Sequence, residues 1–247
     1  MTYCIASREP WPPPTAFTMI LDRLLRPLRE FGPAVGTLYI VDRMLRRPSA
    51  RAGVYFYELV AQPVAAEPLL APAHRRDLRW TTVTPQSPEL VQMPRSAAAL
   101  QARFDQGAMC IAVYRKEHFI GYAWFCFERY HEDEVRCVYV LAAPERMVFD
   151  FDVYIFPQYR IGRAFAAVWD SANEFLRQRG IEHTCSRISR FNLASRQAHA
   201  RLGTRSLGHA LFLRAGAWQF TLHTLHDSAR GAPHIHLSRR AEPRLTL

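Results

Sequence analysis

Strand-like and helix-like segments alternate along residues 147–222, and this alternation constrains the fold more than any other feature of the sequence. Within this region, Phe165, Trp169 and Leu176 follow the 3.6-residue period of a helix, and Gly180 supplies a stop signal. The predicted order is strand Met147–Phe156, helix Arg163–Arg179, strand His183–Ser189, helix Leu193–Leu202 and a hairpin of Leu207–Leu213 with Trp218–Leu222. Strands before, between and after two helices predict an α/β domain.

Further elements are predicted upstream of this region. The predicted strands are Gly53–Val64 and Leu78–Val83, the short helices are Ser87–Gln92 and Ser96–Phe104, and a hairpin joins Ala108–Tyr114 to Phe119–Phe127. Residues 65–76 are rich in Pro and Ala and are interpreted as a linker. We therefore predict an N-terminal extension with a linker over 1–76, a domain over 77–225 and a disordered polar tail over 226–247.

The segment that follows the strand 147–156 has the properties of a phosphate site. The strand ends at Pro157, a short Arg/Gly segment turns the chain, and a helix begins at once. Such a turn presents free backbone N–H groups and the positive end of a helix to an anion. Side chains alternate along the strand, so Asp150, Asp152 and Tyr154 are expected to share one face.

The order of elements over roughly residues 77–225 resembles the GNAT superfamily of N-acetyltransferases. Pro157, Tyr159 and Arg160 match the P-x-Y-R pattern that, in this family, leads into a Gly-rich turn and a helix holding the coenzyme A pyrophosphate. The later family motif is matched at Asn192, Ser195 and Gly203, with His199 in place of the usual Tyr. The turn after Arg160 is one residue shorter than the family spacing.

The resemblance implies a GNAT-like mixed, mostly antiparallel central sheet flanked by helices, preceded by a helical or irregular N-terminal extension. It also implies acetyl-CoA or a longer acyl-CoA as co-substrate and an amine as acceptor, which makes the expected activity that of an acyltransferase. The residues expected to bind the co-substrate are Tyr154, Ile155, Phe156, Tyr159, Arg160, Ile161, Gly162, Arg163, Ala164, Asn192 and Ser195. Asn192 is also among the best residue types for capping the helix that follows it.

Three side chains are candidates for proton transfer. Asp152 and Asp150 lie on the strand where the family often places its general base, although either could instead pair with an Arg. His199 stands where the family often has a Tyr that acts as general acid, and an imidazole can donate a proton near neutrality. A helix His between two Ala residues could equally be a packed, hydrogen-bonded residue.

The net charge of +10 favours polyanionic partners without choosing among them. Residues 16–51 contain seven Arg against three acidic residues and are amphipathic, so they could lie on an anionic membrane or pack on the protein's own core. A basic extension beside an acyltransferase would suit acylation of an amino sugar or of a lipid-linked precursor of surface polysaccharide. A protein amine as acceptor stays open, and the rival interpretation is a non-catalytic nucleic-acid-binding or regulatory protein.

The sequence lacks the motifs of several other functional classes. His223, His226, His234 and His236 show no metal-site spacing, and no GxSxG, Walker or dinucleotide motif is present. The five Cys residues are scattered, and no signal peptide or run of about 18 apolar residues occurs. We expect a cytoplasmic protein without a bound metal, soluble or peripheral at the inner membrane surface.

Overall fold

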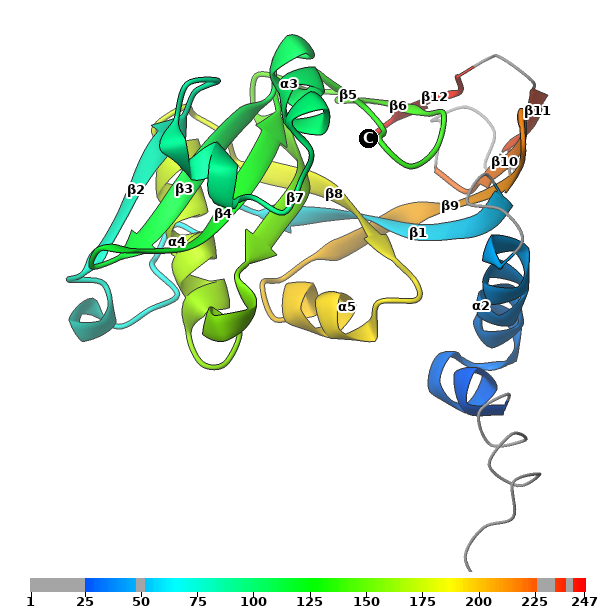
Figure 1. Ribbon diagram of the computed structural model, residues 1–247, viewed down its shortest axis with the longest axis horizontal. Coiled ribbons are helices and arrows are strands. Elements are labelled where there is room, and N and C mark those ends of the chain that lie inside the picture. The colour runs from blue at the N-terminus through cyan, green and yellow to red at the C-terminus, as the bar shows by residue number, and fades with distance from the viewer. Residues whose placement is uncertain (1–24, 48–51, 226–233, 239–241) are drawn as a thin grey trace, which may run out of the picture.

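The computed structural model describes residues 25–47, 52–225, 234–238 and 242–247 (Figure 1). Its main sheet has nine strands in the order β11-β10-β9-β1-β8-β7-β4-β3-β2, and all neighbours are antiparallel except β7 and β8. A smaller sheet has the order β12-β6-β5. The mixed, mostly antiparallel sheet flanked by helices that the sequence predicts is confirmed.

The predicted elements have bounds close to those observed, and the structure adds short strands that the sequence does not predict. The strands are β1 Ala52–Pro63, β2 Leu78–Val83, β3 Met109–Arg115, β4 His118–Cys126, β5 Arg129–His131, β6 Val138–Val140, β7 Met147–Ile155, β8 His183–Ser189, β9 Arg205–Ala215, β10 Trp218–His223, β11 His234–Ser238 and β12 Arg244–Thr246. The α-helices are α2 Pro33–Arg46, α3 Ala97–Asp105, α4 Ala164–Arg177 and α5 Leu193–Ala200. Short 3-10 helices span Pro72–His74, Pro88–Gln92 and Pro157–Tyr159.

Strand β1 comes from the predicted N-terminal extension but lies inside the main sheet. It pairs with β8 on one side and with β9 on the other, as Figure 1 shows. Because β1 has a neighbouring strand on each side, its side chains Val54, Tyr57 and Leu59 are almost fully buried. Residues 52–63 therefore share one sheet with strands from the predicted domain 77–225, and a boundary at residue 76 does not separate two sheets.

Helix α2 contains most of the described part of the basic amphipathic segment, and it packs on β1. Asp42 accepts a hydrogen bond from the backbone N–H of Val54 at 2.8 Å and forms an ion pair with Arg46 at 2.7 Å. The rings of Phe31 and Tyr39 lie within 5.4 Å of each other, and Tyr39 meets Phe191 edge-on at 5.5 Å. This part of the segment covers the protein's own sheet, whereas residues 16–24 and 48–51 lie outside the described residues.

The C-terminal segment contributes two strands, β11 and β12. The prediction of a disordered tail is therefore wrong for the residues of these strands. Strand β11 pairs with β10, and β12 runs parallel to β6. Leu245 is 1% exposed, and the backbone N–H of Leu247 donates to the carbonyl of Val140 at 2.9 Å. Short strands whose pairing partner is far away in sequence carry little local signal.

The core divides between the two faces of the main sheet. Helix α4 packs on one face, where Trp169 and Phe175 are fully buried. On the other face, the Tyr130 ring stacks on Phe151 at 4.4 Å and on Phe149 at 5.1 Å. No helix in the described ranges is long and apolar enough to span a membrane.

Candidate functional site

Strands β7 and β8 separate soon after they meet. They pair only between Met147–Phe149 and His183–Cys185. Beyond that point β7 stays with β4 as far as Ile155, and β8 stays with β1 as far as Ser189. The edge of β7 that faces β8 therefore has no strand partner over 150–155 in the described chain, and its backbone groups are available to an extended ligand. We call residues 150–155 and 186–189 the splay.

The turn after β7 leads directly to an uncapped helix. After the 3-10 helix Pro157–Tyr159, α4 begins at Ala164, and the side chain of its N-cap residue Arg163 makes no capping hydrogen bond. Gly162 has φ +97°, and no atom lies within 4 Å of where a Cβ would stand. Ile161 is 96% exposed. The N–H groups of the first turn of α4 are thus approachable by an anion.

The other residues of the turn fix its position against the sheet. The Nε atom of Arg160 donates to the carbonyl of Ile155 at 3.0 Å, and its guanidinium lies 5.3 Å from the centre of the Tyr154 ring. Tyr159 packs against the α4 side of the core, and the ring of Phe156 meets Phe119 edge-on at 4.9 Å. The turn is therefore anchored on the sheet, and it carries the positive charge of Arg160 and Arg163.

A β-bulge separates the two aspartates of β7. Asp152 is paired with Trp124 and Asp150 with Phe125, so Phe151 is an extra residue in the strand. A bulge interrupts the strict alternation of side chains. Asp152 reaches Arg95 and Arg103, whereas Asp150 faces Thr184 and Ser186 of β8. The prediction that Asp150 and Asp152 share one face is therefore wrong.

Asp150 stands where β7 and β8 part, directly after the last paired residue Phe149. Its side chain is buried, with 4% exposure, and burial raises its pKa to about 7 although the Thr184 and Ser186 hydroxyls act in the opposite direction. The Oδ2 atom has no hydrogen-bond partner in the described part of the chain. A carboxylate with these properties can accept a proton near neutral pH.

Asp152 has a different environment. Its two oxygens are held by Arg95 at 3.0 Å and by Arg103 at 2.7 Å, and the Arg103 side chain is only 5% exposed. The two guanidinium groups therefore occupy the oxygens with which a base would contact its substrate. This geometry fits the alternative of pairing with Arg and does not favour Asp152 as the base.

His199 is a packed residue between α5 and α4. Its Nδ1 atom lies 3.2 Å from the Oε1 atom of Gln62, and its ring meets Trp169 and Phe165 edge-on at 5.6 and 5.8 Å. Burial lowers the pKa of His199 to about 4. The imidazole is therefore neutral at pH 7, which does not favour the role of general acid.

The start of α5 is capped by the side chain of Asn192. The Oδ1 atom of Asn192 accepts a hydrogen bond from the backbone N–H of Ser195 at 3.0 Å. This bond satisfies one of the free donors of the helix. Asn192 is exposed and Ser195 is half-buried, so the capping role is present whatever else these residues do.

Three consecutive acidic residues contact side chains in the splay or next to it. Glu132 forms an ion pair with Arg187 of β8, and Asp133 forms one with Arg103 of α3 at 3.3 Å. Glu134 accepts a hydrogen bond from the Tyr57 hydroxyl of β1 at 2.6 Å. The sequence analysis did not select these residues, although three adjacent acids are a signal that cationic partners lie nearby.

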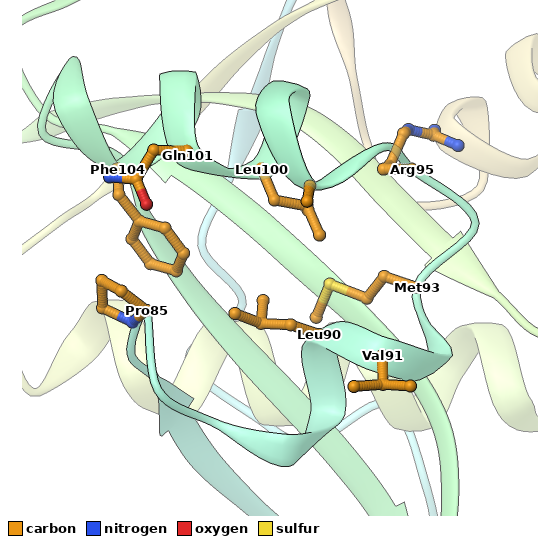
Figure 2. Close-up of a pocket in the computed structure, with 9 residues that line it drawn as sticks. Pro85, Leu90, Val91, Met93, Arg95, Leu100, Gln101 and Phe104 are labelled. Atoms are coloured by element: carbon orange, nitrogen blue, oxygen red, sulfur yellow. The ribbon is translucent and has the colours of Figure 1, made fainter.

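An apolar pocket of about 330 Å³ lies between the 3-10 helix Pro88–Gln92 and α3. Figure 2 shows Leu90, Met93, Leu100 and Phe104 directed toward the same space, with Arg95 at one end. Because Arg95 also binds Asp152, this pocket adjoins the β7 side of the splay. Among the described residues, no group of His, Cys, Asp and Glu could hold a metal ion.

Sequence comparison identifies no match: no family model and no curated protein matches the chain. Several solved structures are similar to parts of the chain. A functionally unknown conserved protein from Staphylococcus epidermidis has a TM-score of 0.48 and 10% identity, over 72% of this chain and 67% of that one. A tandem GNAT protein from the clavulanic acid biosynthesis pathway has a TM-score of 0.47 and 13% identity, over 67% of this chain and 54% of that one.

The GCN5-related N-acetyltransferase from Sphaerobacter thermophilus is a third similar structure, with a TM-score of 0.42 and 13% identity over 74% of this chain and 57% of that one. The strand, helix and hairpin order predicted from the sequence is present in the chain itself. At these TM-scores and identities the likeness carries no argument about this chain, and its function has to be argued from the site.

Proposed function

We propose that this protein transfers an acyl group from an acyl-CoA, acetyl-CoA or a longer ester, to an amine. The observation that carries the proposal is the parting of β7 and β8 beside the uncapped start of α4. An unpaired strand edge suits the extended pantetheine arm of coenzyme A, and an approachable helix N-terminus suits its pyrophosphate. Both features lie at the same end of β7.

The donor would be held by the residues around this junction. The turn from Tyr159 to Ala164 would bind the pyrophosphate, with Ile161 and Gly162 leaving the backbone open and with Arg160 and Arg163 supplying counter-charge. Backbone N–H groups of Tyr154, Ile155 and Phe156 would polarise the thioester carbonyl, although the N–H of Phe156 already donates to Ile120 at 3.1 Å. Asn192 and Ser195 would contribute from the start of α5.

In the reaction, an acceptor ammonium first loses a proton, and the neutral amine attacks the thioester carbon. The carbon–sulfur bond then breaks and the electron pair leaves with the thiolate, while the former amine nitrogen loses its second proton, which passes through solvent to the thiolate and restores the thiol. We assign the first step to Asp150, which takes the proton directly or through one water molecule. Its pKa of about 7 lets it exist as a base at neutral pH without the neutralising arginines that surround Asp152.

For the acceptor, we propose an amino sugar or a lipid-linked precursor of surface polysaccharide. Partial support comes from α2, where Met44 is 63% and Val41 38% exposed beside the basic residues Arg43 and Arg47. Exposed apolar groups flanked by arginines suit the surface of an anionic membrane.

A Met44→Glu variant should sediment less with anionic vesicles than the unmodified protein, and equal sedimentation would contradict membrane association.

The central experiment measures thermal unfolding with acetyl-CoA, decanoyl-CoA and duplex DNA at two salt concentrations. A ligand at about 100 times its Kd stabilises by about 2.7 kcal/mol, which corresponds to a Tm increase of roughly 5–10 °C for a chain of this size. Thiol release with a panel of amines then tests transfer. No shift with any CoA ester would overturn the proposal, while a salt-sensitive shift with DNA alone would support the nucleic-acid alternative.

A further inference from the structure

A second cavity, of about 360 Å³, lies between the β3–β4 turn and the turn before α4. Arg115, Lys116 and His118 line it from the hairpin, and Gln158, Ile161 and Ala164 line it from the other side. The cavity therefore adjoins the start of α4, where the pyrophosphate of the donor is proposed to bind. Three basic side chains at one cavity are a binding environment for an anion.

One of the basic groups of this cavity has a donor that is unpaired in the described structure. The Nη2 atom of Arg115 is buried and has no hydrogen-bond partner among the described residues. A buried guanidinium N–H without a partner is costly, so it points to a ligand that supplies an acceptor. The acidic residue of the turn, Glu117, does not neutralise the cavity, since it is highly exposed and its ion pair is with Arg79 at 3.6 Å.

Lys116 adds a second, independent feature. It has φ 54°, the left-handed region that Gly and Asn adopt more readily than Lys. Its backbone N–H donates to the carbonyl of Asp77 at 2.7 Å, which holds the turn in this conformation. This conformation is unfavourable for Lys, and a functional use of its charge would account for it; it is the single Lys of the whole sequence.

We propose that this cavity binds the 3′-phosphate of coenzyme A, separately from the pyrophosphate at α4. The inference rests on the proposed function. A phosphate monoester carries about −1.5 to −2 charges at pH 7 and three acceptor oxygens, which match the free Arg115 donor and the Lys116 ammonium. The turn after Arg160 is one residue short, so it offers less backbone to the donor's phosphates, and the hairpin cations compensate.

The test compares the Kd of coenzyme A with that of 3′-dephospho-coenzyme A by calorimetry. The unmodified protein should prefer coenzyme A by about tenfold or more, the size expected of one charge-assisted hydrogen bond. Arg115→Gln and Lys116→Asn should each remove most of this preference while leaving the Kd of the dephospho compound unchanged. The matched control is Arg146→Gln, which removes an exposed Arg at the opposite end of β7 and should keep the full preference.

The outcomes separate the two proposals. If the unmodified protein binds neither compound, the proposed function fails together with this inference. If it binds both equally, or if the variants weaken both by the same factor, only the 3′-phosphate site fails. Should Arg115→Gln not fold, Lys116→Asn carries the test alone, because the side chain is exposed and Asn tolerates a positive φ.

Discussion

At the scale of single residues, burial decides the charge of Asp150 and His199. Neither side chain forms an ion pair with a residue that the structure describes, so burial favours the neutral form of each: the pKa of Asp150 rises to about 7 and that of His199 falls to about 4. Asp152 lies on the same strand as Asp150 but is held by two arginines. The local sequence is similar around the two aspartates, and their difference comes from what the fold places beside them.

Asp150→Asn should lower activity and raise stability at alkaline pH. The folded state holds the Asp150 proton up to about pH 7 and the unfolded chain releases it near 3.8, so stability falls as the pH rises between these values. Asn removes a penalty of up to about 4 kcal/mol at pH 8, while kcat should fall by about 100-fold or more. Thermal unfolding at pH 5 and pH 8 and steady-state kinetics check both effects.

The control for this variant is Asp77→Asn, which changes an exposed carboxylate and should alter neither property. Lower stability of Asp150→Asn at pH 8, or an unchanged kcat, would contradict the role assigned to Asp150.

His199→Phe should remove a destabilisation of the protein in acid. Because the pKa of His199 is lowered from 6.5 to about 4, the unfolded chain binds the proton first, and stability is lost as the pH falls below 6.5. Relative to the variant, the natural protein should lose about 2 kcal/mol between pH 7 and pH 5. Denaturant unfolding at the two pH values measures this. A 100-fold loss of kcat in the variant would restore the role of general acid.

At the scale of elements, α4 is the helix whose function and stability make opposite demands. Its N-cap is Arg163, a residue that makes no capping hydrogen bond, whereas α5 is capped by Asn192. A helix start left without a cap keeps its N–H groups free for an anion. The sequence predicted the Asn192 cap and free N–H groups at the start of α4, because both depend on residues adjacent in the chain.

Arg163→Asp should stabilise the free protein and weaken donor binding. Aspartate at the N-cap is worth about 1 kcal/mol, which raises Tm by roughly 2–4 °C, but its charge and its hydrogen bond oppose a phosphate at the same N–H groups. The Tm increase caused by acetyl-CoA should disappear. Arg146→Asp makes the same charge change away from the turn and should leave that increase intact. A full acetyl-CoA effect in Arg163→Asp would count against the pyrophosphate site.

At the scale of the whole molecule, distant segments complete the sheets. Strand β1 lies between β8 and β9, and the C-terminal strand β12 joins β6 in the small sheet. Glu132 and Asp133, next to that sheet, reach Arg187 in the splay and Arg103 of α3, which binds Asp152 on the other side of the splay. Strands β1 and β12, which come from opposite ends of the described chain, therefore support the elements that border the proposed site.

Leu245→Ala should destabilise the protein by about 2–4 kcal/mol, as expected for a fully buried Leu. The control is Thr246→Ala, an exposed neighbour in the same strand, which should change stability by less than about 0.5 kcal/mol. Denaturant unfolding compares the two variants. Equal stability of both would mean that the C-terminal strand does not pack as described.

The sequence by itself determined the order and type of most elements, the turn before α4 and the cap of α5, because periodicity, turn residues and caps act between neighbours in the chain. It did not determine the place of β1, the short strands β5, β6, β11 and β12, or the bulge at Phe151 that puts Asp150 and Asp152 in different surroundings. It also could not supply the burial that sets the pKa of Asp150 and His199. These features depend on pairing and packing between distant residues, which only the tertiary structure decides.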